Sequence, residues 1–360
     1  MKNQSSLIDF ILKEWLLISS GVGLLLTSIY AKHTPHYSIQ ELQVLFILLA
    51  LFVTVNGLKR SGFILKVTQT IEQGKAIPLK LVITTFFLSM VITNDVALIV
   101  IVPLTLVLNI TRKDILVIME ALAANAGSAL TPFGNPQNLY IYWFYGLHPT
   151  EFLTTIAPFS ITFLFLLTVS ALFIKTNNEL NIVAVSQPVD KFAYFYGIML
   201  VILLLTVIHL LPILTGLMVI IFALLFDRKT LRIDYSLLFS FFFFFGFAGN
   251  LSVLLKSEMG NAGHIFVFSA LASQIMSNVP ATMLFAKFTS NWKALLWGTN
   301  VGGFGSLFGS FANLIAYKIY ITHENKNNIA LFIGKFLVLG YAAFFLSIAL
   351  YFILYRMQGL

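Results

Sequence analysis

The sequence predicts an all-α polytopic membrane protein assembled from two inverted repeats. Hydrophobic residues make up 59% of the 360 positions and charged residues only 10%, whereas soluble domains carry about 25% charged residues. The apolar residues lie in runs long enough to cross a bilayer as helices. Two of these runs are interrupted, the first by prolines, a glycine and asparagines and the second by a cluster of glycines. We therefore expect about nine transmembrane helices, two re-entrant hairpins and two broken helices.

Charge and cysteine content exclude several other classes. The net charge is +8, but the basic residues lie in short loops between apolar runs. That is the positive-inside pattern of membrane proteins, so we expect the lipid bilayer as a partner and no nucleic acid. The sequence has no cysteine, which excludes disulfides, thiolate metal sites and iron–sulfur clusters.

The first repeat is expected to span residues 1–174, with a short cytoplasmic segment at its start. Helices should follow at Trp15–Ala31, which lacks a cleavage pattern and is interpreted as retained, and at Leu42–Leu58. Within residues 63–75 the apolar side chains share one helical face. This pattern favours an amphipathic helix on the cytoplasmic interface, with a solvated loop as the alternative.

The first hairpin is predicted over residues 78–109, which are apolar except for Thr93-Asn94-Asp95 in the middle. As one helix this segment would be about 48 Å long, against a hydrocarbon core of roughly 30 Å. Divided at Asn94, each arm is roughly 20 Å long and too short to cross. The spacing therefore predicts a re-entrant hairpin with a polar tip near the middle of the membrane.

The first broken helix is predicted over residues 115–145, which contain Thr-Pro-Phe-Gly-Asn-Pro-Gln-Asn at 131–138. Two prolines and a glycine cannot continue a helix. A broken backbone is tolerated in a bilayer only inside protein or beside a water-filled cavity, and many secondary transporters bind substrate and ions at such breaks. A simple proline kink is the alternative. A helix at Phe152–Ile174 and a cytoplasmic linker at 175–191 follow.

The second repeat, residues 192–360, is predicted to contain the same kinds of element. We expect helices at Phe192–Leu211, Ile213–Phe226 and Tyr235–Leu255, a hairpin at 264–288 with Ser277-Asn278-Val279 at its tip, a broken helix at 292–320 with a glycine-rich break, and a last helix at Asn328–Tyr355.

The two broken helices align with each other at an offset of 175 residues. Two like halves, each with a polar-tipped hairpin before its broken helix, are typical of transporters built from inverted repeats. Seven of 18 aligned positions are identical: Asn125, Gly127, Phe133, Gly134, Asn138, Leu139 and Tyr142 pair with Asn300, Gly302, Phe308, Gly309, Asn313, Leu314 and Tyr317.

Loop charges favour hairpins that do not cross the membrane. With a cytoplasmic N-terminus and neither hairpin crossing, only five of the 22 lysines and arginines lie outside: Lys32, Lys256, Lys287, Lys293 and Arg356. If the first hairpin crosses, the split becomes 11 against 11. We therefore predict a multi-pass protein of the cell (inner) membrane, with one hairpin entering from each side.

Three ionisable residues lie within or beside the apolar segments. Asp95, at the first tip, is expected to bind Na⁺ or a proton, or to cap the second arm of the hairpin. Glu120 lies about two helical turns from Arg112, so an interfacial ion pair is the favoured interpretation. His209 is expected to pack near Pro212 at a helix end.

The tips and breaks together suit an anion that moves with a cation. Helix N-termini, hydroxyls and amides at the tips can bind carboxylates, and carbonyl oxygens in the breaks are hard ligands for Na⁺. The sequence has no phosphate-binding loop, no metal-spaced histidines and no nucleophile–base pair, so we expect no enzyme, no cofactor and no use of ATP. Na⁺ or H⁺ is the expected coupling ion. A non-transporting membrane scaffold is disfavoured because broken helices would serve no purpose there.

At these positions the chain resembles the ion transporter superfamily, most closely the divalent-anion:sodium symporters, with a citrate-transporter-like domain. Arsenite permeases and sodium/proton antiporters are neighbours. The Ser-Asn-Thr tips of the symporters correspond to Thr93-Asn94-Asp95 and Ser277-Asn278-Val279, and their Gly-Thr-Pro-Pro-Asn-like break corresponds to residues 134–138. Residues 305–310 match the second break more weakly. The resemblance covers most of the chain.

The resemblance implies an elevator-type homodimer whose tips bind a small anionic substrate and whose tips and breaks bind Na⁺. Asp95 and Val279 replace the threonines of the tip triplets, so a Na⁺/H⁺ antiporter or an arsenite-type efflux permease is the alternative. The implied substrate-binding residues are Thr93, Asn94, Asn135, Pro136, Ser277, Asn278 and Val279. The implied cation-binding residues are Asn94, Asp95, Asn125, Gly134, Asn138, Asn278, Asn300, Ser306, Gly309 and Asn313.

Overall fold

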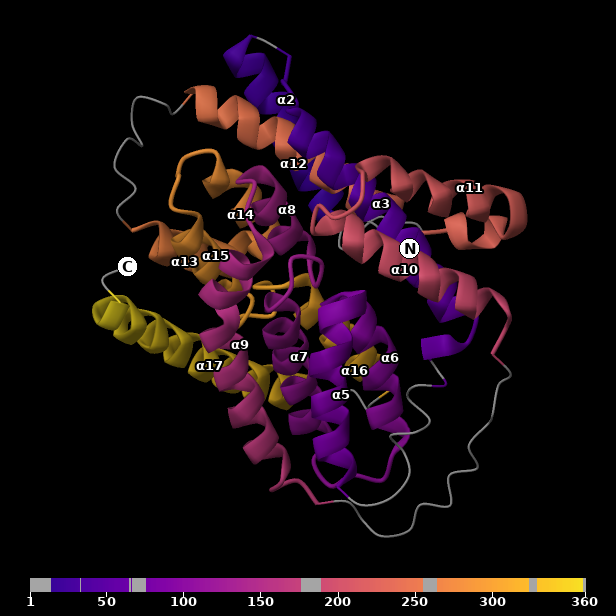
Figure 1. The fold of residues 1–360 in the computed structure, drawn as a ribbon. Helices are drawn as coiled ribbons and strands as arrows, with labels where there is room; N and C mark the ends of the chain where they lie inside the picture. The colour runs from indigo at the N-terminus through magenta and orange to yellow at the C-terminus, as the bar shows by residue number, and fades with distance from the viewer. Residues whose placement is uncertain are drawn as a thin grey trace, which may run out of the picture.

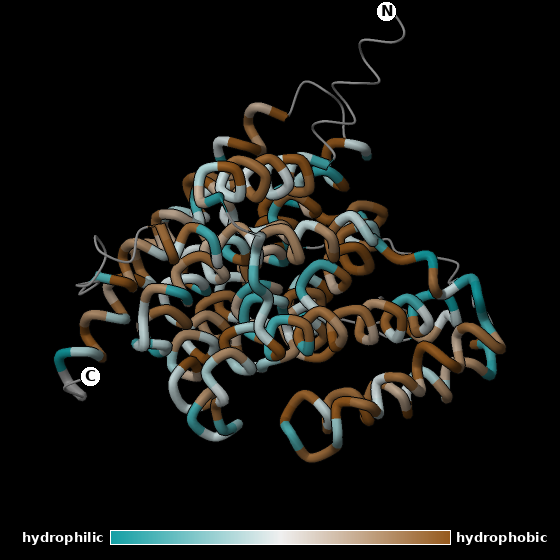
Figure 2. The backbone as a smooth tube through the Cα atoms, turned by 90° about the horizontal axis from the view of Figure 1, so that it is seen from above, coloured by the Kyte–Doolittle hydropathy of each residue, from teal (hydrophilic) through white to brown (hydrophobic). Residues whose placement is uncertain are grey.

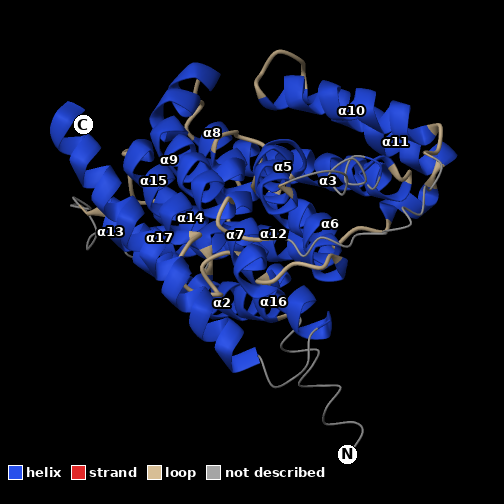
Figure 3. Ribbon diagram, turned by 90° about the horizontal axis from the view of Figure 1, so that it is seen from below, coloured by secondary structure: helices blue, strands red, loops and turns tan. Residues whose placement is uncertain are grey.

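The protein is helical throughout the part of the chain that the structure, a computed structural model, describes (Figure 3). The described residues are 14–32, 34–64, 66, 76–175, 189–254, 264–323 and 329–358. Within these described residues, four helices are long and apolar enough to cross a membrane: α3 (Ile39–Arg60), α9 (Pro149–Ala171), α12 (Tyr235–Leu254) and α17 (Ile329–Gln358). Figure 2 shows long hydrophobic stretches along the helices, with hydrophilic residues at many of the turns. The prediction of an all-α polytopic membrane protein is confirmed.

Shorter apolar helices lie where the sequence predicted them. They are α2 (Trp15–Ala31), α10 (Phe192–Val207) and α11 (Gly216–Phe226), with the 3-10 turns η1 (Ile213–Thr215) and η2 (Arg228–Leu231) beside α11. Helix α10 ends four residues earlier than predicted, because His209 has a φ of +63° that a helix cannot continue through. Most of the predicted amphipathic helix over 63–75, and most of the linker over 175–191, lie outside the described residues.

Both predicted hairpins are pairs of short helices joined at a single residue. Helices α5 (Ile77–Ile92) and α6 (Asn94–Val107) meet at Thr93, and α13 (Ile265–Met276) and α14 (Asn278–Ala286) meet at Ser277. Thr93 has φ and ψ of 81° and 150°, and Ser277 has 71° and 155°. This region of backbone space is nearly restricted to glycine and costs other residues about 1–3 kcal/mol. The two tips therefore share one strained conformation.

Both predicted broken helices contain a non-helical break of several residues, so the proline-kink alternative is wrong. Helices α7 (Lys113–Ala129) and α8 (Pro136–Phe144) are separated by residues 130–135, and α15 (Trp292–Gly302) and α16 (Phe311–His323) by residues 303–310. Asn135 begins α8, since its side chain accepts a hydrogen bond from the backbone N–H of Asn138 at 2.9 Å. The proline at the first position of α8 is compatible with a helix start and not with its interior.

The helices pack into two groups (Figure 1). In the peripheral bundle, α2 packs on α12, and α10 and α11 pack on α3. In the central bundle, which comprises α5–α9 and α13–α17, α5 packs on α7, α13 on α15 and α6 on α16. The bundles meet where α3 contacts α8 and α12 contacts α14. Each central hairpin therefore lies against the broken helix that follows it in the chain.

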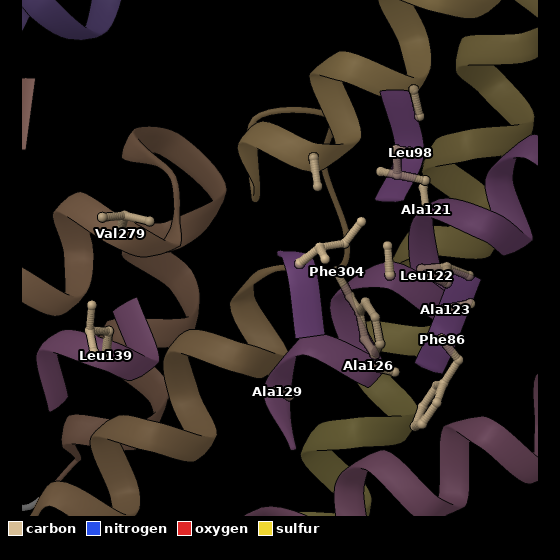
Figure 4. Close-up of a cluster of buried hydrophobic side chains, with 14 of the residues drawn as sticks. Phe86, Leu98, Ala121, Leu122, Ala123, Ala126, Ala129, Leu139, Val279 and Phe304 are labelled. Atoms are coloured by element: carbon tan, nitrogen blue, oxygen red, sulfur yellow. The ribbon is translucent and has the colours of Figure 1, made fainter. Parts of the chain in front are cut away.

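Glycine permits the closest of these helix contacts. A Cβ atom added to Gly127 of α7 would lie 2.1 Å from the carbonyl oxygen of Phe86 in α5. A Cβ at Gly302 of α15 would lie 2.4 Å from the Cβ of Ser273 in α13. Figure 4 shows part of the first seam, where Phe86 lies beside Ala123 and Ala126 of α7. Small residues at equivalent places in the two halves thus bring backbone against backbone.

Two ion pairs join segments distant in sequence. Lys287, after α14, lies 2.7 Å from the carboxylate of Glu41 in α3, and Lys335 of α17 pairs with Asp114 of α7. The loop-charge prediction places Glu41 and Lys287 outside and Asp114 and Lys335 inside. In each pair, therefore, both partners are predicted to lie on the same side of the membrane. The absolute orientation of the chain stays a prediction.

We predict that Lys287→Gln destabilises the contact between the bundles. Glu41 is fully buried and Lys287 is 16% exposed, and removing one member of a buried pair typically costs about 3–5 kcal/mol. Thermal unfolding should show a lowered melting temperature for Lys287→Gln and a partial recovery in the double variant Glu41→Gln/Lys287→Gln. Lys293→Gln, an exposed lysine, is the control. A double variant less stable than the single one would argue against the pair.

We also predict that Gly127→Ala destabilises the protein by about 1–3 kcal/mol, because the added methyl group overpacks the α5–α7 seam. Gly334→Ala in α17 is the matched control, since a Cβ there meets nothing within 4 Å and alanine is favoured in a helix by roughly 0.5–1 kcal/mol. Denaturant unfolding of the two variants should therefore give changes of opposite sign. Equal stability of both variants would contradict the close approach.

Candidate functional site

The two hairpin tips are bound to the breaks of the two broken helices. The backbone N–H of Asn94 donates to the carbonyl oxygen of Gly134 at 3.2 Å. In the other half, the N–H of Asn278 donates to the carbonyl oxygen of Gly309 at 3.0 Å. These are the same contact made twice. The carbonyl groups predicted to bind a cation at Gly134 and Gly309 each already accept one hydrogen bond.

Hydroxyl side chains hold each break on the first arm of its hairpin. Thr131 Oγ1 donates to the carbonyl oxygen of Met90 at 2.7 Å, and Ser306 Oγ donates to that of Gln274 at 3.0 Å. The second half adds a clamp: Gln274 Nε2 donates to Gly302 O at 2.8 Å, and Gln274 Oε1 accepts from the N–H of Ser306 at 2.8 Å. Sequence reasoning missed Gln274, because a lone glutamine in an apolar helix carries no motif.

Asn138 and Asn313 stabilise the open backbone of the breaks. Asn138 Nδ2 donates to the carbonyl oxygens of Ser128, Ala129 and Thr131 at 3.2, 3.0 and 3.3 Å. Asn313 Nδ2 donates to those of Gly303 and Ser306 at 2.9 and 3.0 Å. Carbonyl groups at the end of a helix have no helical partner, so these amides replace the missing N–H groups.

Asparagine pairs also join the two halves directly. Asn125 Nδ2 donates to Asn313 Oδ1 at 2.8 Å, and Asn300 Nδ2 donates to Asn138 Oδ1 at 2.8 Å. Asn125 Oδ1 in turn accepts from Asn94 Nδ2 at 3.1 Å. Five of the predicted cation-binding residues therefore lie together at the centre of the molecule. Their amide groups are engaged mostly with one another and with the backbone.

A small space of about 20 Å³ lies between the two tips. We call it the tip space. Its polar lining residues are Asn94, Asp95, Gln137, Ser277, Asn278 and Ser310, and Pro136, Val279 and three apolar residues of α2 and α12 also line it. A space of this size holds about one water molecule, so a substrate fits only after the tips or α12 move.

A larger cavity of about 280 Å³ begins beside the tip space. We call it the Asp95 cavity. It lies between α3 and the start of α12 on one side and α6 and α16 on the other, and its polar lining residues are Asn56, Lys59, Thr93, Asp95, Arg232 and Asp234. Asp95 lines both spaces, which puts its carboxylate between the tips and the larger cavity.

Asp95 is half-buried in the first turn of α6. Its backbone N–H donates to Asn94 Oδ1 at 3.0 Å. Among the described residues no hydrogen bond to its carboxylate is formed, so the predicted capping role is not observed and the carboxylate is available for a cation.

The other predicted substrate-binding residues take different places. Both polar groups of Asn135 serve the break: its Oδ1 caps α8, and its Nδ2 donates to Ser128 Oγ at 3.1 Å. Pro136 and Val279 line the tip space, and Figure 4 shows Val279 close to Leu139 of α8. Thr93 lines the Asp95 cavity.

The predicted ion pair between Glu120 and Arg112 is wrong. Glu120 is fully buried, and the hydroxyl group of Thr105 donates to its carboxylate, whereas Arg112 is exposed before α7 begins. The packing of α6 on α7 brings Thr105 to Glu120, a contact that spacing along one helix could not predict. The predicted packing role of His209 near a helix end is confirmed, but the contacts are with α8: its ring lies 5.3 Å from that of Tyr142 and 4.4 Å from that of Trp143.

Comparison with known proteins identifies the family. Residues 10–297 match the model of the family CitMHS, described as "Citrate transporter", a span that includes both hairpins and the first broken helix. The chain belongs to the CitMHS citrate transporter family.

Two curated relatives match most of the chain. The uncharacterized transporter MJ0456 of Methanocaldococcus jannaschii is 33% identical over 343 residues, which cover 90% of this chain and 92% of the relative. The inner membrane protein YbiR of Escherichia coli is 32% identical over 322 residues, which cover 84% of this chain and 86% of the relative. The resemblance to citrate-transporter-like permeases is confirmed, and the chain is a membrane transporter.

We predict that Asn138 and Asn300 stabilise the protein as a coupled pair. Single Asn138→Ala and Asn300→Ala variants should each lower stability, because each leaves buried groups without hydrogen bonds. The double variant should be less destabilised than the sum, with a coupling of about 0.5–3 kcal/mol. Denaturant unfolding measures the cycle. The control is Ser240→Ala, which removes a buried hydroxyl group that donates to Ser236 O within α12. Its change in unfolding free energy should add to that of Asn138→Ala. Additivity of Asn138 and Asn300 would contradict the cross-repeat bond.

Proposed function

We propose that this chain is a secondary active transporter that moves a small anion, a carboxylate such as citrate, across the cell (inner) membrane together with Na⁺ or H⁺. One observation carries the proposal: both strained tips start a helix at the same small space, beside two breaks rich in carbonyl groups. The positive ends of α6 and α14 attract carboxylates there. Asn94, Asn278, Thr93 and Ser277 are the proposed hydrogen-bonding partners of the substrate.

The coupling cation is proposed to bind near Asp95 and the breaks. Asp95 supplies the negative charge, and Asn300 Oδ1 and the break carbonyls supply neutral oxygen ligands of the kind that hard cations select. Bound close to the substrate, the cation would offset part of its negative charge. In this proposal the anion site needs no deeply buried lysine or arginine, and the described residues include none. The anion then needs its cation to bind.

Transport is proposed to proceed by movement of the central bundle against the peripheral bundle. The tip space is closed on one side by Leu237 and Phe241 of α12, and α12 contacts α14 across the boundary. A carboxylate therefore reaches the tips only if this contact shifts. We retain a homodimer and a cytoplasmic N-terminus as parts of the same proposal.

The alternative function is a Na⁺/H⁺ antiporter or an arsenite-type efflux permease. It is favoured by one feature, the carboxylate of Asp95 at the tip position where the dicarboxylate symporters have threonine. In that case Asp95 exchanges ions itself and no organic anion is bound.

We predict that citrate, or another anion of a test panel, raises the melting temperature of the purified protein only when Na⁺ or acid pH supplies the cation. A ligand at 100 times its Kd adds about 2.7 kcal/mol of stability. Asp95→Asn should fold normally and lose this cation dependence, whereas Asp190→Asn, an exposed carboxylate outside both cavities, should keep it. A Na⁺ effect that grows with pH, disappears in Asp95→Asn and is indifferent to every anion would establish the antiporter instead.

A further inference from the structure

The Asp95 cavity carries two cationic side chains to which the proposed function assigns no role. Lys59 comes from the last turn of α3 and Arg232 from the segment before α12. Both are exposed, whereas Thr93 in the same cavity is only 6% exposed. The cavity therefore runs from a charged, solvent-exposed end to the first hairpin tip.

The segment that carries Arg232 is fixed to α3. Asn56 Nδ2, one turn before Lys59, donates to the carbonyl oxygens of Thr230 at 2.9 Å and Arg232 at 3.2 Å. The hydroxyl groups of Tyr196 and Thr230 form a further hydrogen bond of 2.8 Å. The backbones that bear the two cations are thus held at one end of the cavity, although 173 positions separate them in the sequence.

Among the described residues neither cation is held in an ion pair, although two carboxylates, Asp95 and Asp234, also line the cavity. Within the described chain, the ion pairs are Glu41–Lys287 and Asp114–Lys335, and neither Lys59 nor Arg232 takes part in one. Asp234 lines the same cavity, but its carboxylate accepts a hydrogen bond from the N–H of Leu237 at 3.1 Å, at the start of α12. Unpaired cations in a cavity with low-dielectric walls raise the local concentration of anions.

We propose that Lys59 and Arg232 form an anion-collecting site at the exposed end of the Asp95 cavity, where a small carboxylate binds before it reaches the tips. This inference rests on the proposed function and names the residues that contact the anion first on the predicted cytoplasmic side. The cavity volume of about 280 Å³ accommodates a small carboxylate, whereas the tip space of about 20 Å³ does not. Asp234 weakens the site, so the anion is held loosely enough to move on.

Topology alone also places lysine and arginine on this side of the membrane. Arg60 and Lys229 separate the two explanations. Arg60 is one position from Lys59, and Lys229 is three positions from Arg232. Both are exposed, but neither lines the cavity. A general charge effect on this face would involve all four residues equally, whereas an anion-collecting site involves only Lys59 and Arg232.

The test measures radiolabelled citrate flux from each face of the membrane, in inside-out and right-side-out vesicles. Lys59→Gln and Arg232→Gln should raise KM at the cytoplasmic face about fivefold at low salt, with kcat unchanged, since a lost charge interaction in a wet site is modest. Lys59→Arg should keep the wild-type KM, and Asp234→Asn should lower it. The differences should shrink near 1 M salt, where the Debye length is about 3 Å. KM at the outer face should not change.

Arg60→Gln and Lys229→Gln are the matched controls and should leave both KM values unchanged. Melting temperatures of all these variants should equal that of the wild type, since the replaced side chains are exposed. Equal KM changes in the cavity and control variants, or equal changes at both faces, would overturn the anion-collecting site while leaving anion transport intact. Wild-type vesicles that move no citrate from either face would overturn the citrate-class substrate and this site with it.

Discussion

The fold depends on one requirement of the membrane interior: every backbone N–H and carbonyl group must find a partner inside the protein. The breaks at 130–135 and 303–310 release carbonyl groups from their helices, and the amides of Asn138 and Asn313 bind five of them. The tips obey the same rule, because the first N–H of each second arm is bound by Gly134 or Gly309. The tips, the breaks and the asparagine pairs are therefore one hydrogen-bonded unit.

Such a unit links the two halves of the molecule through polar side chains. Asn125 and Asn300 each reach into the opposite half and bind the asparagine that holds the break there. A ligand that binds a carbonyl group of one break would therefore disturb the hydrogen bonds of an amide that is linked to the other break. Buried polar networks of this kind are rigid when every member is satisfied. The strain at Thr93 and Ser277 fits this description, since backbone strain persists only where the surroundings over-determine it.

The helices, the breaks and the centre of the candidate site could be predicted from the sequence. Helix length, proline and glycine constrain the backbone locally, so their effects can be predicted without knowing the tertiary contacts. Thr93 and Ser277 could be placed at tips from arm length alone, and the paired asparagines emerged from the internal repeat. Partners that come from another helix could not be predicted. Thr105 reaches Glu120 from α6, and Gln274 clamps a break some 30 residues away. Lys59 and Arg232 meet only because α3 packs on η2. The segment between the tip asparagine and the asparagine of the following broken helix also differs in length between the two halves. Asn94 and Asn125 are 31 residues apart, whereas Asn278 and Asn300 are 22 residues apart. The hairpins therefore do not align at the offset of 175 residues that aligns the broken helices.

The two sides of the molecule differ in a way that bears on the proposed movement of the central bundle against the peripheral bundle. On the predicted cytoplasmic side the boundary between the bundles holds a cavity of about 280 Å³ that ends at Asp95. On the opposite side the boundary is held by the pair of Glu41 and Lys287, and the ammonium group lies 5.3 Å from the centre of the Phe144 ring. A movement that opens the outer side must separate this pair, and the separated charges regain water as the gap fills. The cost of opening is thereby reduced by hydration. The ion pair therefore stabilises the boundary while water is excluded, and water stabilises the two separated charges once the boundary opens. An apolar contact of the same area would gain no such stabilisation from water.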